Sequence, residues 1–481
     1  MDTKTTVRPA EAPLLLEMIF GRYEKKRAKR MMKQIVTRVG QGYRQIDKKR
    51  ERLFEININN ENRKNHIFLF GSTGVGKTRL AELMIVQDIY AGRNVVFIDP
   101  KSDADMLNTV IATAIKAGRM NELLFLSPIF PEFSIQINPT SHYYIYEEII
   151  EHVMAAVPSE DEFFYKVAKE TTMAIVQSIV LKRRATGKHN IKINLEEIAN
   201  YAYYDGLKNL KDGISNIVDK QLQSEIAKTT KLLEQILSSP QDYFSKVSTT
   251  LRSTLNIMTN GNIGKVLGNA NKNTLVERLE SGRGTILYVQ TGTLLARETA
   301  NVVGKEVISM IQSVVGRYYV SGKAFKRELC LYIDELSNVV YRGIQDLYNK
   351  GRGAGVWIMG MTQSIADMIA VLGEDGAKQL LDNTNTKIIM RVQDLESAKV
   401  FAELGGTRKS NSPIMSSTGG ITVRETDEYA VLPEDMLRLQ KREFYYFGFE
   451  GQFFGKTNAV KPVNFKIKLP NILQEKEEDA A

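Results

Sequence analysis

The stretch Gly71-Ser72-Thr73-Gly74-Val75-Gly76-Lys77-Thr78 decides the fold expected of this chain. It satisfies the phosphate-loop pattern GxxxxGK(S/T) at every required position. An apolar run over residues 66–70 precedes it, and apolar residues recur at helical spacing over 79–85. The motif therefore lies between a predicted strand and a predicted helix, which is the context that nucleotide binding requires.

Each part of the motif has a physical task. The glycines let the backbone curl so that N–H groups point toward phosphate oxygens, and the helix N-terminus adds partial positive charge. Lys77 is predicted to reach the β- and γ-phosphates, and the Thr78 hydroxyl is predicted to ligate Mg²⁺. The alternative is a glycine-rich turn that binds nothing. We predict a site for ATP and Mg²⁺ over all of residues 71–78.

The composition limits the class of protein. The chain has 481 residues, of which 43% are hydrophobic and 25% charged, as in ordinary globular proteins. Its net charge of +9 favours a polyanionic partner or reflects a basic solvated surface. The single cysteine allows no disulfide within the chain, and no apolar run approaches the ~20 residues of a membrane span. We expect a cytoplasmic protein with no transmembrane segment, peripheral at most to the inner face of the membrane.

Alternating strand and helix patterns on both sides of a purely helical stretch predict an α/β fold with an inserted all-α domain. Residues 14–55 are predicted to be helical, and the basic part from Arg22 to Arg52 could touch DNA, anionic lipid or only water. The predicted parts are a basic, mostly helical N-terminal segment (1–60), the first part of the α/β domain (61–140), the all-α insertion (141–265), the second part of the α/β domain (266–470) and an acidic tail (471–481).

An apolar strand pattern over residues 328–333 ends in Asp334 and Glu335. Beside a phosphate loop, this is the Walker B arrangement, in which Asp334 holds Mg²⁺ and Glu335 activates the attacking water. The alternative is an ordinary strand end with two acids. We predict that both carboxylates lie beside Lys77 and Thr78.

Three further residues are candidates for contact with the γ-phosphate. Gln363 follows the next predicted strand, where an amide could sense the γ-phosphate or merely end the strand. Arg352 is predicted to lie on a glycine-flanked loop, as an arginine finger for a neighbouring subunit or as an exposed residue at a helix end. Arg391, at the end of a later predicted strand, leaves the same two interpretations open.

The ordered set of segments resembles the motifs of conjugative coupling ATPases of the TraG/TraD type, within the HerA–FtsK superfamily, and is most similar to those of TraD proteins from integrative conjugative elements. The resemblance covers about residues 65–470. The segments that carry it are 71–78, 97–101, 138–139, 332–335, 349–355, 362–364, 383–391, 394–398 and 431–437.

This resemblance implies a RecA-like motor domain with an inserted all-α domain. It implies a homo-hexamer that hydrolyses ATP and feeds relaxase-bound single-stranded DNA into a type IV secretion channel. Its implied partners are relaxase, accessory DNA-processing proteins and channel proteins. It assigns Gln363 to γ-phosphate sensing, and Arg352 and Arg391 to the neighbouring subunit's site. Family members usually carry N-terminal membrane helices, so membrane contact is expected through a partner or the basic N-terminal segment.

Other functions are compatible with the same motifs. A secretion-channel assembly ATPase or a HerA-like DNA helicase would use the same core on a different cargo. A non-motor adaptor would bind relaxase or DNA and use the nucleotide only to organise a ring. Glu335 favours hydrolysis over the adaptor, because an adaptor needs no catalytic carboxylate.

Overall fold

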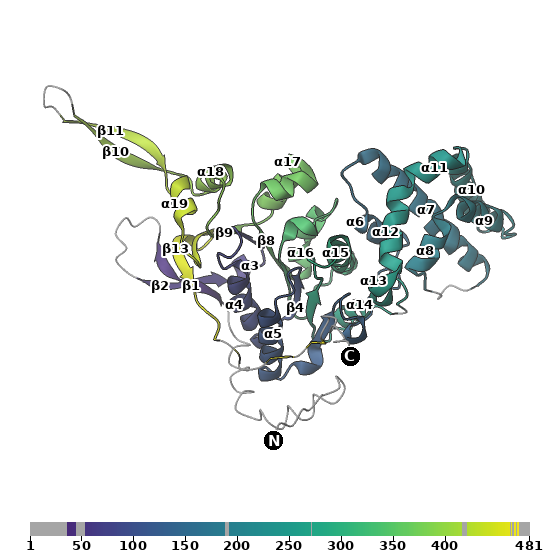
Figure 1. The fold of residues 1–481 in the computed structure, drawn as a ribbon, viewed down its shortest axis with the longest axis horizontal. Coiled ribbons are helices and arrows are strands. Elements are labelled where there is room, and N and C mark those ends of the chain that lie inside the picture. The colour runs from purple at the N-terminus through teal and green to yellow at the C-terminus, as the bar shows by residue number, and fades with distance from the viewer. Residues whose placement is uncertain are drawn as a thin grey trace, which may run out of the picture.

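The computed structural model describes residues 36–44, 53–187, 192–270, 272–415, 421–461, 463, 466–467 and 469–470. Its centre is an eleven-stranded sheet in the order β2-β1-β13-β12-β9-β3-β8-β7-β4-β6-β5 (Figure 1). The strands are β1 (Val36–Arg44), β2 (Phe54–Asn59), β3 (Ile67–Phe70), β4 (Asn94–Asp99), β5 (Leu123–Leu126), β6 (Ile286–Gln290), β7 (Leu329–Ile333), β8 (Val356–Thr362), β9 (Thr386–Ile389), β12 (Glu443–Gly448) and β13 (Gly451–Thr457).

The strands from β9 to β5 in this order are all parallel to their neighbours. Strands β3, β4, β6, β7 and β8 are buried along their whole length, as expected for a parallel sheet covered on both faces. One face packs against α4 (Lys77–Tyr90) and α5 (Ala104–Lys116). The other packs against α15 (Arg297–Val320) and α16 (Gln345–Ala354). The predicted α/β fold is confirmed.

The residues between β5 and β6 form a helical region, which lies to one side of the sheet, at the right of Figure 1. Its helix α6 packs against α15 of the sheet domain. The exact domain boundaries stay a prediction. The helices of this region are α6 (Glu147–Ala156), α7 (Glu162–Ala185), α8 (Leu195–Tyr201), α9 (Tyr204–Ser215), α10 (Gln223–Leu237), α11 (Gln241–Val247), α12 (Thr249–Thr259), α13 (Gly261–Val266) and α14 (Thr274–Glu280).

The prediction of a helical N-terminal segment is wrong over residues 36–44 and 54–55, which lie in strands β1 and β2. The remainder of residues 14–55, apart from Leu53, and the acidic tail lie outside the described residues. Side chains of β1 alternate between exposed and buried positions, and the strand pairs with β13 near the other end of the chain. This pairing across more than 400 residues, with Gly40 opposite Thr457, overrides any local helical preference.

The remaining elements are α3 (Asn60–Arg63), α17 (Ala366–Asp382), α18 (Leu395–Leu404), α19 (Pro433–Arg438) and the hairpin of β10 (Thr407–Met415) with β11 (Ile421–Tyr429). The hairpin forms its own two-stranded sheet and projects away from the main sheet, at the upper left of Figure 1. Among the described residues, no helix combines the length and apolar character that a membrane crossing requires.

A buried ionic cluster ties helix α4 to α3 and to strand β7. Asp88 on α4 accepts hydrogen bonds from Arg63 at 2.6 and 2.5 Å, from Arg93 at 2.8 Å and from the Tyr332 hydroxyl at 2.5 Å. Both guanidinium groups also lie over the ring of Trp357. Burial alone would raise the pKa of Asp88, but the nearby charges of Arg63 and Arg93 lower it to about 2.

We predict that Asp88→Asn destabilises the protein by about 3–5 kcal/mol in urea unfolding, because two buried cations lose their counter-charge. The pKa of Asp88 is lower in the folded protein than its ordinary value of 3.8, so the stabilisation is present above pH 4 and lost as pH falls toward 2. The difference between wild type and variant should therefore shrink over that range. Asp105→Asn, which removes an exposed carboxylate, is the control and should cost at most about 1 kcal/mol.

Candidate nucleotide site

The order of the central strands assembles the site. Strand β8 pairs in parallel with β3 on one side and with β7 on the other. Because parallel strands end at the same edge of a sheet, the loops after β3, β8 and β7 meet there. These loops carry the phosphate loop, Gln363 and the Asp334–Glu335 pair. The order of the strands in the sheet therefore brings the two Walker motifs close together.

The Lys77 side chain folds back onto the backbone of its own phosphate loop. The buried Nζ atom of Lys77 donates to the carbonyl oxygens of Gly71 at 2.5 Å and Ser72 at 3.1 Å. Burial lowers the pKa of Lys77 to about 8, with Asp334 opposing this change and Lys101 adding to it. Gly76 caps helix α4 with a φ of 116°, a conformation that side chains of other residues rarely adopt. The loop thus has the cradle shape that phosphate binding requires.

The Walker B aspartate faces the end of this loop. Asp334 is 1% exposed, and its Oδ2 accepts a hydrogen bond from the Thr78 hydroxyl at 3.4 Å. Two hard oxygen ligands are thereby brought to one place, as predicted for Mg²⁺ coordination. Glu335, the next residue, is half-buried and has a φ of 48°, in the left-handed region. Its own N–H donates to Oδ1 of Asp334 at 3.0 Å.

Lys101 is a site residue that the sequence reasoning missed. Its Nζ atom lies 3.3 Å from Asp334 Oδ2 and 3.4 Å from Glu335 Oε1, so one ammonium group contacts both Walker B carboxylates. The segment 97–101 belongs to the family resemblance, but the sequence gives this lysine no chemical role. Lys101 comes near the Walker B carboxylates because β4, the strand before it, pairs with β7, and the sequence gives no sign of that pairing.

A rigid turn positions Lys101. The Asp99 carboxylate accepts backbone N–H groups from Lys101 at 3.0 Å, Ser102 at 3.1 Å and Asp103 at 2.7 Å. The Tyr288 hydroxyl donates to the same carboxylate at 2.5 Å. Burial raises the pKa of Asp99 to about 6, with these hydrogen bonds opposing the change, so the group is mostly ionised at neutral pH. The Asp99 carboxylate therefore fixes the turn, because the backbone N–H groups of the turn donate to it.

Gln363 lies at the mouth of the phosphate loop. Its Oε1 accepts a hydrogen bond from the Thr73 hydroxyl at 3.2 Å, and its side chain is exposed. The structure thus brings Gln363 beside the loop in which a γ-phosphate would lie. Its role as a sensor stays a prediction.

The two candidate arginines lie in different places. Arg352 is exposed in the last turn of helix α16, so its placement on a loop is wrong; the helix continues through Gly351 and Gly353 and ends at Gly355, with a φ of 84°. This turn precedes β8 and lies at the sheet edge opposite the phosphate loop. Arg391 is also exposed, but its carbonyl oxygen accepts the Ser72 N–H at 2.8 Å, so it lies beside its own subunit's loop.

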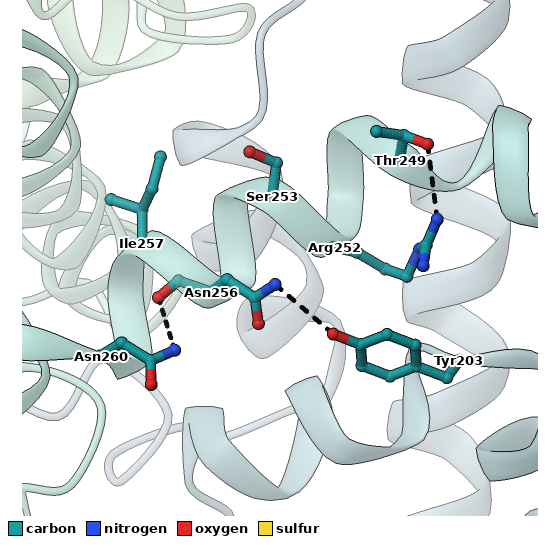
Figure 2. Close-up of a pocket in the computed structure, with 7 residues that line it drawn as sticks. All are labelled: Tyr203, Thr249, Arg252, Ser253, Asn256, Ile257 and Asn260. Carbon is teal, nitrogen blue, oxygen red and sulfur yellow. Dashed lines mark hydrogen bonds between the residues drawn. The ribbon is translucent and has the colours of Figure 1, made fainter.

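A groove of about 680 Å³ lies along helix α12 in the helical region (Figure 2). The Arg252 guanidinium lies 5.2 Å from the centre of the Tyr203 ring, and the Tyr203 hydroxyl accepts a hydrogen bond from Asn256 at 3.4 Å. None of the residues that line the groove is acidic, and only Ile257 is apolar. They are Tyr203, Thr249, Arg252, Ser253, Asn256, Ile257 and Asn260.

We predict that Gly76→Ala weakens binding of an ATP analogue at least about 10-fold, because the added Cβ lies 3.0 Å from Arg442 Cγ in a backbone conformation that alanine disfavours. Fluorescence titration measures the affinity. Gly118→Ala is the matched control, since Gly118 also has a positive φ of 68° but an added Cβ meets nothing within 4 Å. Equal affinities in wild type and Gly76→Ala would show that the loop tolerates the change.

Comparisons with known proteins agree with this geometry. Residues 328–441 match the family model described as the TraM recognition site of TraD and TraG. The structure is similar to the bacterial conjugative coupling protein TrwBdeltaN70, with a TM-score of 0.65, 15% identity, and coverage of 92% of this chain and 93% of that chain. For the plasmid coupling protein TrwB in complex with ADP and Mg²⁺, the TM-score is 0.62 at 16% identity, with 85% and 88% covered.

A more distant similarity is to VirB4 of Thermoanaerobacter pseudethanolicus, with a TM-score of 0.50, 11% identity, and 82% of this chain and 90% of that chain covered. A comparison with curated protein sequences gives no match. The resemblance inferred from the motifs is thus confirmed at the level of fold, RecA-like core included. The chain has the fold of the conjugative coupling protein TrwB, and its residues 328–441 match the family model of the TraM recognition site of TraD and TraG.

Proposed function

We propose that this chain is an ATP-driven DNA translocase that acts as a coupling protein and delivers relaxase-bound DNA to a type IV secretion channel. One observation carries the proposal: the phosphate loop, Gln363 and the Asp334–Glu335 pair meet at one edge of the sheet. This is the arrangement that hydrolysis of a nucleoside triphosphate needs, and the fold is that of coupling proteins. TrwB, the coupling protein of similar fold, has been seen with ADP and Mg²⁺ and with a non-hydrolysable ATP analogue.

The residues of the site divide the chemistry among themselves. Backbone N–H groups of residues 71–78 and the Lys77 ammonium bind the phosphates. Thr78 and Asp334 would hold Mg²⁺, which supplies positive charge to the β- and γ-phosphate oxygens. Glu335 accepts a proton from the attacking water, and Gln363 contacts the γ-phosphate only until it is released. Loss of that contact is the signal for a change of shape.

A ring of subunits accounts for the position of Arg352. In a head-to-tail ring, the sheet edge that carries Arg352 in one subunit can face the nucleotide of the next. An arginine from a neighbour stabilises the charge that develops during phosphoryl transfer. We assign Arg352 this role in a hexamer. Arg391 lies beside its own phosphate loop, which favours a contact within the subunit.

The groove on α12 is our candidate contact for single-stranded DNA. Its arginine, tyrosine, hydroxyl and amide side chains are the types that contact phosphates and stack on bases without reading sequence. The Nη2 atom of Arg252 donates to the Ser245 carbonyl and to the Thr249 hydroxyl, which positions the guanidinium at the groove. The net charge of +9 also favours a polyanion.

A coupling protein needs partners that deliver the DNA and partners that receive it. The match of residues 328–441 to a TraM recognition site supports docking of an accessory DNA-processing protein on this segment. We also propose contacts with relaxase and with channel proteins at the inner face of the membrane, through which the motor is attached.

Glu335→Gln tests the chemistry. The amide cannot accept a proton, so we expect ATPase turnover to fall by about 100-fold or more while ATP-analogue affinity stays within about twofold of wild type. The measurement is phosphate release with and without single-stranded DNA, beside fluorescence titration of the analogue. Glu328→Gln, which changes an exposed glutamate before β7, is the control.

The same assay separates the alternatives. Turnover that DNA does not stimulate would favour the secretion assembly ATPase, an alternative that the VirB4-like fold keeps open. Nucleotide binding without turnover in the wild type would favour the adaptor. Unchanged turnover in Glu335→Gln would remove this residue from its assigned role.

Variants of the groove test the DNA contact. We expect Tyr203→Ala and Arg252→Ala each to weaken binding of a single-stranded oligonucleotide about 5- to 100-fold, since a base loses its stacking partner or a phosphate its cation. Arg252→Ala should also reduce the salt slope by roughly 0.7, the value for one phosphate of a single strand. Lys228→Ala, which removes an exposed charge on α10 outside the groove, is the control. Fluorescence anisotropy at several salt concentrations gives both quantities.

A further inference from the structure

A second cavity connects the helical region to the Walker B turn. It has a volume of about 890 Å³ and lies between α12, the start of α15 and the short 3-10 helix Leu336–Asn338 that follows Glu335. Thr249, Ser253 and Ile257 of α12 line both this cavity and the groove. Ser337 and Asn338 form part of its opposite wall. The groove on α12 therefore adjoins the cavity that Asn338 lines. The charged lining of the cavity is mixed, with Arg297 and Lys305 beside Glu160, Glu298 and Asp367.

Asn338 holds the catalytic glutamate. Its side-chain N–H group donates to Oε2 of Glu335 at 3.0 Å, while the Lys101 ammonium lies 3.4 Å from Oε1. Both oxygens of the carboxylate are thereby engaged by donors. A carboxylate held by a donor at each oxygen has a fixed orientation. The left-handed conformation of Glu335 shows that the turn constrains the backbone as well.

We propose that Asn338 is a positioning residue that keeps Glu335 in a resting orientation and releases it when DNA occupies the α12 side of the cavity. The inference rests on the proposed function, since it concerns regulation of the same site. Of the two donors, Lys101 is charged and also contacts Asp334, whereas Asn338 is uncharged and lines the cavity. The residue thus links the DNA-contacting helix to the base that activates water.

Asn338→Ala tests this assignment. Without the amide donor, Glu335 is free to activate water in the absence of DNA, so basal turnover should rise about 3- to 10-fold. Stimulation by a single-stranded oligothymidylate should fall toward onefold, because the restraint that DNA removes is already absent. Affinity for a fluorescent ADP analogue and the urea midpoint of unfolding should match wild type.

Asn338→Asp separates positioning from packing. Aspartate keeps the size of asparagine but cannot donate when ionised, so it should raise basal turnover as alanine does. If it restores wild-type behaviour instead, the side chain acts by filling space and the inference is wrong. Asn121→Ala, an exposed asparagine before β5, is the control and should behave as wild type.

The outcomes distinguish this inference from the proposed function. Unchanged basal turnover and unchanged stimulation in both Asn338 variants, with Glu335→Gln inactive, would overturn the inference alone. Reduced basal turnover in both variants with normal stability would also overturn it, because a released base should not be a weaker one. Full turnover in Glu335→Gln would overturn the proposed function and the inference together.

Discussion

The pairing of β8 with both β3 and β7 is the constraint on which the site depends. It places one strand between the strand that leads into the phosphate loop and the strand that ends in Asp334. The distance between Thr78 and Asp334 is consequently set by backbone hydrogen bonds of a buried sheet. Such a sheet is covered on both faces and resists local distortion, so the oxygens that would hold a metal ion stay in register.

Around this frame, the site balances charges of both signs, of which Lys77 and Asp334 are buried. Lys77 and Lys101 oppose Asp334 and Glu335, and the Asp99 turn holds one of these lysines in place. Charges this close together interact strongly where one of them is buried, as Asp334 is. Each of the two carboxylates has a donor of opposite charge in Lys101.

The helical region gives the motor a surface that the sheet alone would not offer. Helix α12 presents amide and guanidinium groups to the groove, and its Thr249, Ser253 and Ile257 line both the groove and the cavity beside the Walker B turn. One helix thus stands between a candidate DNA contact and the catalytic glutamate. This placement gives a physical route by which cargo can control hydrolysis.

The sequence by itself determined the phosphate loop, the Walker B carboxylates, the helical insertion and the α/β class, because each depends on residues close together along the chain. The motif spacing and the apolar periodicity are local properties of this kind. Only the tertiary structure decided that Lys101 and Asn338 engage Glu335, that Arg352 lies at the far edge of the sheet and that residues 36–44 form a strand. These depend on segments brought together by folding: β1 is a strand since β13 pairs with it, and Lys101 reaches Glu335 since β4 lies beside β7. Side-chain contacts across such pairings have no signature in a single sequence, which is why the residues around the catalytic carboxylates could not be read from it.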